Sequence, residues 1–129
     1  MLSEDNTMAV HARILLVDDS KLARMALRAA LGDLVADIDM DVKEAPDAET
    51  ALGLLEHEPF DAVLMDYNMP GMDGLSAATL IRTRFPKTGV ALVTANAQDA
   101  IVAEAQLIGV PLIPKPVQRR DLQTFLLAS

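Results

Sequence analysis

Four short, uninterrupted runs of apolar residues are spaced along the chain, at 14–17, 62–65, 90–93 and 110–113. Runs of this length are typical of strands buried on both faces, as in a parallel sheet. A further strand is expected at 41–45. There, the alternation of acidic and apolar residues from Asp37 to Val42 is typical of a sheet edge. The same stretch does not fit a calcium-binding EF-hand loop, because Val42 and Ala48 stand where the loop needs Gly and Glu.

The segments between these runs predict helices at 21–31, 47–56, 74–84, 97–108 and 117–128. Ser20 is placed to cap the first helix and Gly32 to end it, while Gly109 is placed to end the fourth. Strands therefore alternate with helices along the whole chain. This order predicts an α/β fold, a doubly wound five-stranded parallel sheet with helices on both faces.

The predicted organisation is one domain at 13–129, preceded by a flexible N-terminal segment at 1–12. A chain of 129 residues suits a single domain. The first residues lack the apolar core of a signal peptide, and no apolar run is long enough to cross a bilayer. We therefore expect a cytoplasmic protein that does not enter the membrane.

The net charge and the lack of cysteine exclude several kinds of partner and several kinds of metal or covalent chemistry. The formal net charge is −8, so we expect no direct binding to nucleic acid or to an anionic membrane surface. The chain has no cysteine, which excludes disulfides and thiolate metal sites.

Five polar residues stand where predicted strands end. Asp18 and Asp19 follow the first strand, Asp66 follows the third, Thr94 ends the fourth and Lys115 follows the fifth. Each alone could be a helix cap, a turn former or a surface residue. Together they fall at the carboxyl edge of the sheet, where ligands of open parallel sheets bind.

Clustered carboxylates need a compensating cation, since two unit charges about 4 Å apart repel by about 1 kcal/mol even in bulk water. Lys115 supplies one positive charge. A hard divalent ion would supply two, and Mg²⁺ (with Mn²⁺ as an alternative) prefers carboxylate oxygens, water and phosphate. The pattern therefore predicts a metal-dependent phosphoryl site.

Four motifs in this order resemble the receiver domains of two-component response regulators. They are Asp18-Asp19-Ser20, the stretch 66–74 (DYNMPGMDG), Thr94-Ala95-Asn96 and Lys115-Pro116. The resemblance covers about residues 14–126. It implies the flavodoxin-like (βα)5 fold with strand order 2-1-3-4-5. It also implies a cis peptide bond before Pro116.

The resemblance implies a signalling domain rather than an enzyme, one that assists its own phosphorylation and dephosphorylation. Asp66 would accept a phosphoryl group from a sensor histidine kinase or a histidine phosphotransfer protein. Asp19 and Asp66 would bind Mg²⁺ through their side chains, Asn68 through its backbone carbonyl, and Asp18 mainly through water. Members of the family act in phosphorelays and in chemotaxis.

The resemblance also implies a switch. Lys115 and Thr94 would bind phosphoryl oxygens, and Thr94 would move on phosphorylation. In the family, an aromatic side chain three positions before the lysine usually turns inward behind the threonine. This chain has Leu112 at that position. The fourth helix, fifth strand and fifth helix would then bind a downstream protein or form a phosphorylation-dependent dimer. The wide apolar surface of the helix at 97–108 fits such a partner site, but deeper burial of its alanines explains it equally well.

Three other functions remain open at this point. A haloacid-dehalogenase-type phosphatase would need a second acid two residues after Asp66, where the chain has Asn68. A receiver-like module could bind a partner without phosphorylation, and Leu112 favours this alternative slightly. A flavodoxin-like cofactor binder would need a glycine-rich loop after the first strand, which is missing.

Overall fold

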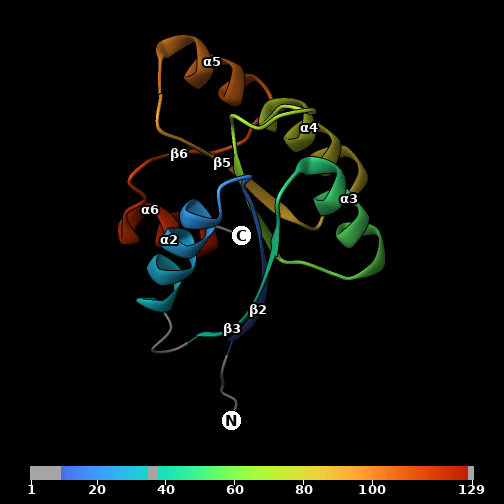
Figure 1. The fold of residues 1–129 in the computed structure, drawn as a ribbon, viewed down its shortest axis with the longest axis vertical. Helices are drawn as coiled ribbons and strands as arrows, with labels where there is room; N and C mark the ends of the chain where they lie inside the picture. The colour runs from blue at the N-terminus through green and yellow to red at the C-terminus, as the bar shows by residue number, and fades with distance from the viewer. Residues whose placement is uncertain (1–9, 35–37, 128–129) are drawn as a thin grey trace.

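The computed structural model describes residues 10–34 and 38–127 of the chain, which alternate between strands and helices (Figure 1). The strands are β2 (Val10–Val17), β3 (Ile38–Ala45), β4 (Ala62–Asp66), β5 (Gly89–Thr94) and β6 (Leu112–Pro114). The helices are α2 (Lys21–Gly32), α3 (Ala48–His57), α4 (Gly74–Arg84), α5 (Asp99–Leu107) and α6 (Arg119–Leu127).

The strands form one parallel sheet in the order β3-β2-β4-β5-β6. In chain order this is 2-1-3-4-5, so the expected doubly wound flavodoxin-like fold is confirmed. The strand with alternating acidic and apolar residues, β3, lies at an edge of the sheet as predicted.

Two hydrophobic cores lie on opposite faces of the sheet, and the pleat of β2 shows why. Ile14 and Leu16 pack in the core under α2 and α6, whereas Leu15 and Val17 pack in the core under α3, α4 and α5. All four side chains are fully buried. A strand between two helix layers needs apolar residues on both faces, which is why its sequence shows a continuous run. Figure 1 shows α2 and α6 on one side of the sheet and α3 and α4 on the other.

Strand β2 begins earlier than predicted. Residues 10–12, expected in a flexible N-terminal segment, extend β2 and pair with β3. Polar pairs stabilise this part of the ladder: His11 contacts Asp39 at 3.1 Å and Arg13 contacts Asp41 at 3.3 Å. A search for runs of apolar residues misses this part of β2, because its polar side chains pair with those of the edge strand β3. Residues 1–9 lie outside the described part of the chain.

The last strand and helix are shorter than predicted. Val110, expected in the strand, is buried, but its N–H donates to the Ala105 carbonyl at 2.9 Å and so helps to end α5. Gly109 has a φ of +70°, the left-handed geometry expected of a helix-terminating glycine. Consequently β6 begins only at Leu112, and α6 begins at Arg119 rather than at residue 117. The predicted end of that helix, Ala128, lies outside the described residues.

Helix starts follow side-chain capping. The Ser20 hydroxyl accepts a hydrogen bond from the Ala23 N–H at 3.2 Å, which confirms its predicted role. Asp47, expected as the first residue of a helix, instead caps α3 by accepting from the Thr50 N–H at 2.7 Å. Helix α5 begins at Asp99 rather than at residue 97, and Gln98 provides no side-chain cap. Of the helices described, none has both the length and the apolar character needed to cross a membrane.

Leu122 is the one residue of the described part of α6 that is fully buried, with Phe125 and Leu126 half-buried beside it, and this gives a test of the fold. Leu122 is fully buried, while Leu127 in the same helix is 70% exposed. We expect Leu122→Ala to lower the free energy of unfolding by about 2–5 kcal/mol. The matched change Leu127→Ala should stay within about 0.5 kcal/mol of the parent protein. Urea denaturation of both variants measures the difference, and equal losses would contradict this packing.

Candidate functional site

The predicted site residues gather at the carboxyl edge of the sheet. Asp18 follows β2, Asp66 is the last residue of β4, Thr94 is the last of β5, and Lys115 follows β6. Because β2, β4, β5 and β6 are successive neighbours in the sheet, residues dozens of positions apart in sequence meet at one edge.

Three carboxylates form a cluster there. Asp18, Asp19 and Asp66 each offer an oxygen, and these atoms lie within 4.8 Å of one another. Asp18 and Asp66 are 1% and 7% exposed, whereas Asp19 is open to solvent. The set fits a hard divalent cation, which takes carboxylate oxygens and keeps several waters on its open side.

The Lys115 ammonium bridges the two buried carboxylates. Its Nζ donates to Asp18 Oδ2 at 3.2 Å and to Asp66 Oδ1 at 3.3 Å. Burial and the neighbouring charge of Asp18 nevertheless raise the pKa of Asp66, although Lys115 opposes the shift. Burial would lower the pKa of Lys115, but the charges of Asp66 and Asp18 raise it above its usual value. Burial and Asp18 therefore disfavour the anionic form of Asp66, and a cation nearby would favour it.

Every polar atom of Asp18 has a partner in the described structure. Its N–H donates to the Ala45 carbonyl at 3.1 Å, and Oδ1 accepts from the Ser20 N–H at 2.9 Å. Its carbonyl accepts from Arg24 Nη1 at 2.6 Å, and Oδ2 accepts from Lys115. Since both carboxylate oxygens of Asp18 already accept hydrogen bonds, contact with a cation through water suits this residue better than direct ligation.

The loop after β4 depends on close backbone packing at Gly74. A Cβ at this position would lie 2.4 Å from the Asp66 carbonyl oxygen and 2.8 Å from the Tyr67 Cα. The Gly74 N–H also donates to the Tyr67 carbonyl at 3.0 Å. Only glycine allows the start of α4 to approach the end of β4 so closely. Asn68 is exposed in this loop, and its predicted role as a carbonyl ligand stays a prediction.

Thr94 and Lys115 are tied together through their backbones. The Lys115 N–H donates to the Thr94 carbonyl at 2.8 Å, and the Lys115–Pro116 bond is cis, as the resemblance implied. The Thr94 side chain is fully buried, and its hydroxyl oxygen accepts from the Asn96 N–H at 3.1 Å. Within the described part of the chain this hydroxyl donates to no acceptor, so its proton can serve one brought to this edge.

Leu112 lies on the strand next to Thr94. It pairs with Leu92 in the β5–β6 ladder, is half-buried, and packs against the core under α3, α4 and α5. Because Leu92 and Thr94 are two residues apart on one strand, Leu112 and Thr94 share that face of the sheet. Its role in a switch stays a prediction.

Sequence reasoning gave no role to Arg24, Glu44 or Gly74. Arg24 lies one turn into α2, and its Nε donates to Glu44 Oε1 at 2.8 Å. This pairing depends on side-chain directions across two elements, which the linear sequence does not display. A glycine at the first position of a helix, directly after the capping Asp73, was the one available signal for Gly74.

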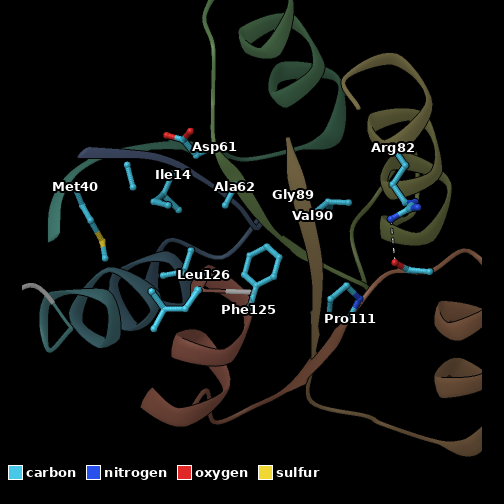
Figure 2. A pocket seen from close by; sticks show the side chains of 13 residues that line it. Ile14, Met40, Asp61, Ala62, Arg82, Gly89, Val90, Pro111, Phe125 and Leu126 are labelled. Atoms are coloured by element: carbon cyan, nitrogen blue, oxygen red, sulfur yellow. Dashed lines mark hydrogen bonds between the residues drawn. The ribbon is translucent and has the colours of Figure 1, made fainter. Parts of the chain in front are cut away.

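A separate cavity of about 300 Å³ lies at the opposite, amino end of the strands (Figure 2). Its lining is mainly apolar, and its two charged residues already have partners. Asp61 accepts from the Arg13 N–H at 2.7 Å, and Arg82 Nη1 donates to the Gly109 carbonyl at 3.0 Å, the dashed line in Figure 2. Asp61 is the one acid in the lining of this cavity, so the carboxyl edge with its three carboxylates is the stronger candidate site.

Comparisons with known proteins agree with this geometry. The family model of the response regulator receiver domain matches residues 14–127. Chemotaxis protein CheY-3 of Vibrio cholerae is 36% identical over 117 residues, covering 88% of each chain. The solved receiver domain of the response regulator NarL from Mycobacterium tuberculosis superposes with a TM-score of 0.78 at 32% identity, covering 92% of this chain and 95% of that one.

Several similar proteins are much longer than this chain. Response regulator protein FleR of Pseudomonas aeruginosa is 39% identical over 112 residues, which is 86% of this chain but 23% of FleR. The glycerol metabolism activator of Pseudomonas putida is 34% identical over 98 residues, or 43% of its length. This chain therefore spans less than half the length of these two relatives.

The close approach at Gly74 gives a test of how the site is built. We expect Gly74→Ala to lower the free energy of unfolding by about 1–3 kcal/mol, because the new methyl group must displace the Asp66–Tyr67 backbone. The control is Gly53→Ala in α3, where a Cβ would meet nothing within 4 Å. That change should stabilise the protein by about 0.5–1 kcal/mol. Denaturant titration distinguishes the two, and a neutral Gly74→Ala would refute the tight contact.

Proposed function

Because this chain belongs to the response regulator receiver domain family, we propose that Asp66 accepts a phosphoryl group in a Mg²⁺-dependent reaction. The donor would be the phosphohistidine of a sensor histidine kinase or of a histidine phosphotransfer protein. The family is a signalling family, and we propose no turnover of a substrate other than the domain's own acyl phosphate.

One observation carries the proposal: three carboxylates and one lysine converge at the carboxyl edge of the sheet. Ionised, they leave the cluster with excess negative charge, which a divalent cation would offset. Asp19 and Asp66 would hold the ion through carboxylate oxygens, and Asp18 would hold it through water. When bound, Mg²⁺ supplies positive charge to the phosphoryl oxygens.

The protein's own groups would perform the transfer by position and charge. An Asp66 carboxylate oxygen attacks phosphorus in line with the leaving imidazole. The new O–P bond forms as the P–N bond breaks, and the electron pair returns to the ring nitrogen. Lys115 already lies 3.3 Å from Asp66 and would move its ammonium onto a phosphoryl oxygen. The Thr94 hydroxyl, at the end of the neighbouring strand, would donate to another oxygen.

The surface of α5, β6 and α6 is the proposed output face. Only Ala105 is buried among the residues of α5, while Ala100, Ala103 and Leu107 are exposed. Deeper burial of its alanines, the alternative explanation for the apolar surface of this helix, is therefore wrong for Ala100 and Ala103. Figure 1 shows α5 standing at the end of the molecule beyond α4 and β6. An apolar, lightly packed helix next to Thr94 suits a partner surface that responds to phosphorylation.

The proposed partner of this face is a downstream protein or a second copy of the chain. We propose a cytoplasmic setting and no direct contact with nucleic acid, on the same grounds of charge as before. The similarity to CheY-3 and to the response regulator FleR is consistent with a role in chemotaxis or in another two-component pathway.

A receiver-like module that works without phosphorylation is the second candidate, favoured by Leu112. An aliphatic side chain there has neither the ring nor the hydroxyl that an aromatic switch uses. The complete set of Asp18, Asp19, Asp66 and Lys115 favours the phosphorylated alternative, because a module without phosphate chemistry has no need of buried, mutually repelling acids.

Phosphorylation is tested by incubating the protein with acetyl phosphate and Mg²⁺. We expect intact mass to report one added phosphoryl group, and we expect no adduct when Mg²⁺ is chelated. Asp66→Asn should abolish the adduct. The control Asp61→Asn changes an acid one residue before the start of the same strand and should leave the adduct intact. Absence of any adduct on the parent protein, at any Mg²⁺ concentration, would favour the phosphorylation-independent module.

The output face is tested by sizing the protein with and without Mg²⁺ and the phosphoryl mimic beryllofluoride, alone and with its downstream partner. We expect the mimic to strengthen self-association or partner binding. Leu107→Ser should then weaken that complex by at least about tenfold, because an exposed leucine would be buried in it. Leu22→Ser on α2, where the leucine is 77% exposed, should have no effect. A mimic that changes neither association nor partner binding would contradict this face.

A further inference from the structure

Arg24 joins the acidic turn to the neighbouring strand. Its Nη1 donates to the Asp18 carbonyl at 2.6 Å, and its Nε donates to Glu44 on β3 at 2.8 Å. The side chain is only 16% exposed, and its backbone N–H donates to the Ser20 carbonyl. One planar guanidinium thus fixes the turn between β2 and α2 against β3.

Arg28, one turn further along α2, provides a natural comparison. Its Nε donates to the other carboxylate oxygen of Glu44 at 2.9 Å, and its Nη2 donates to the Val42 carbonyl at 3.1 Å. It is 49% exposed and makes no hydrogen bond with the acidic turn. The two arginines therefore share a helix and a carboxylate partner, but only Arg24 reaches Asp18.

We propose that Arg24 is a positioning residue for the cation site: through the Asp18 carbonyl it holds Asp18 and Asp19 in the geometry that binds a divalent ion. This inference rests on the proposed function. Glu44 keeps the Arg24 guanidinium in place, and the Glu44 carboxylate is in turn fixed by Arg24 and Arg28.

Whether removing Arg24 weakens or tightens Mg²⁺ binding distinguishes a positioning role from a purely electrostatic one. Arg24 carries a positive charge close to the carboxylate cluster, so as a charge alone it would repel Mg²⁺, and its removal would tighten binding. As a positioning group it orders the turn before the ion arrives, so its removal must weaken binding. Partners that orient the groups around a metal typically contribute about tenfold or more to affinity.

The test is Mg²⁺ affinity measured by calorimetry at constant low ionic strength, for the parent protein, Arg24→Ala and Arg28→Ala. We expect Arg24→Ala to weaken Mg²⁺ binding by about tenfold. Arg28→Ala should leave the affinity unchanged or slightly tighter. At saturating Mg²⁺, acetyl phosphate should modify Arg24→Ala at Asp66 to the same extent as the parent protein, because the loss lies in cation affinity.

Thermal denaturation without Mg²⁺ shows whether each variant folds. If Arg24→Ala does not, Arg24→Lys replaces it: lysine keeps the charge but lacks the planar fork that serves both acceptors, so affinity should fall to an intermediate value. Unchanged or tighter Mg²⁺ binding in the folded Arg24 variants, or an equal loss in Arg28→Ala, would overturn the inference. A parent protein that binds no Mg²⁺ would instead refute the proposed function.

Discussion

Repulsion among acidic side chains is the constraint on which the functional edge of this protein depends. Asp18 and Asp66 are buried side by side, and burial makes their mutual repulsion stronger than it would be in water. The Lys115 ammonium between them is the contact that makes the arrangement tolerable. Lys115 reaches them because its backbone is bonded to Thr94 at the end of β5, so the order of the strands determines the electrostatics of the edge.

The single positive charge of Lys115 does not neutralise the three carboxylates. This imbalance would make the edge prefer cations over free anions. Three carboxylates against one ammonium leave an excess of negative charge when all are ionised. Such an edge repels a free anion and attracts a divalent cation. Once the cation is bound, the same edge becomes favourable for a phosphoryl group. The metal requirement of the proposed reaction therefore rests on the charge balance of these residues.

Much of this could be predicted from the sequence, for identifiable reasons. Strands buried on both faces show as continuous apolar runs, and residues at strand ends can be assigned to one edge once the strands are parallel. The start of β2 was missed because polar pairs such as Arg13–Asp41 stabilise it, and the start of β6 because Val110 bonds to the end of α5. The role of Arg24 depends on contacts between elements, which no local pattern records, and the glycine after the capping Asp73 was the one local sign of the close packing at Gly74.

Under the proposed function, the uneven packing of the helices indicates which of them would respond to a change at this edge. The cores under α2 and α6 and under α3 and α4 contain fully buried side chains such as Leu31, Ile81 and Leu122, and close-packed regions resist small displacements. Helix α5 contributes only Ala105 to the interior. It follows β5 in the chain and precedes β6, the two strands that end in Thr94 and lead to Lys115. A change in the contacts of Thr94 or Lys115 would therefore meet least resistance at α5. The helix that places the least side-chain volume in the core also carries Leu107, which at 86% is the most exposed large hydrophobic residue among those described.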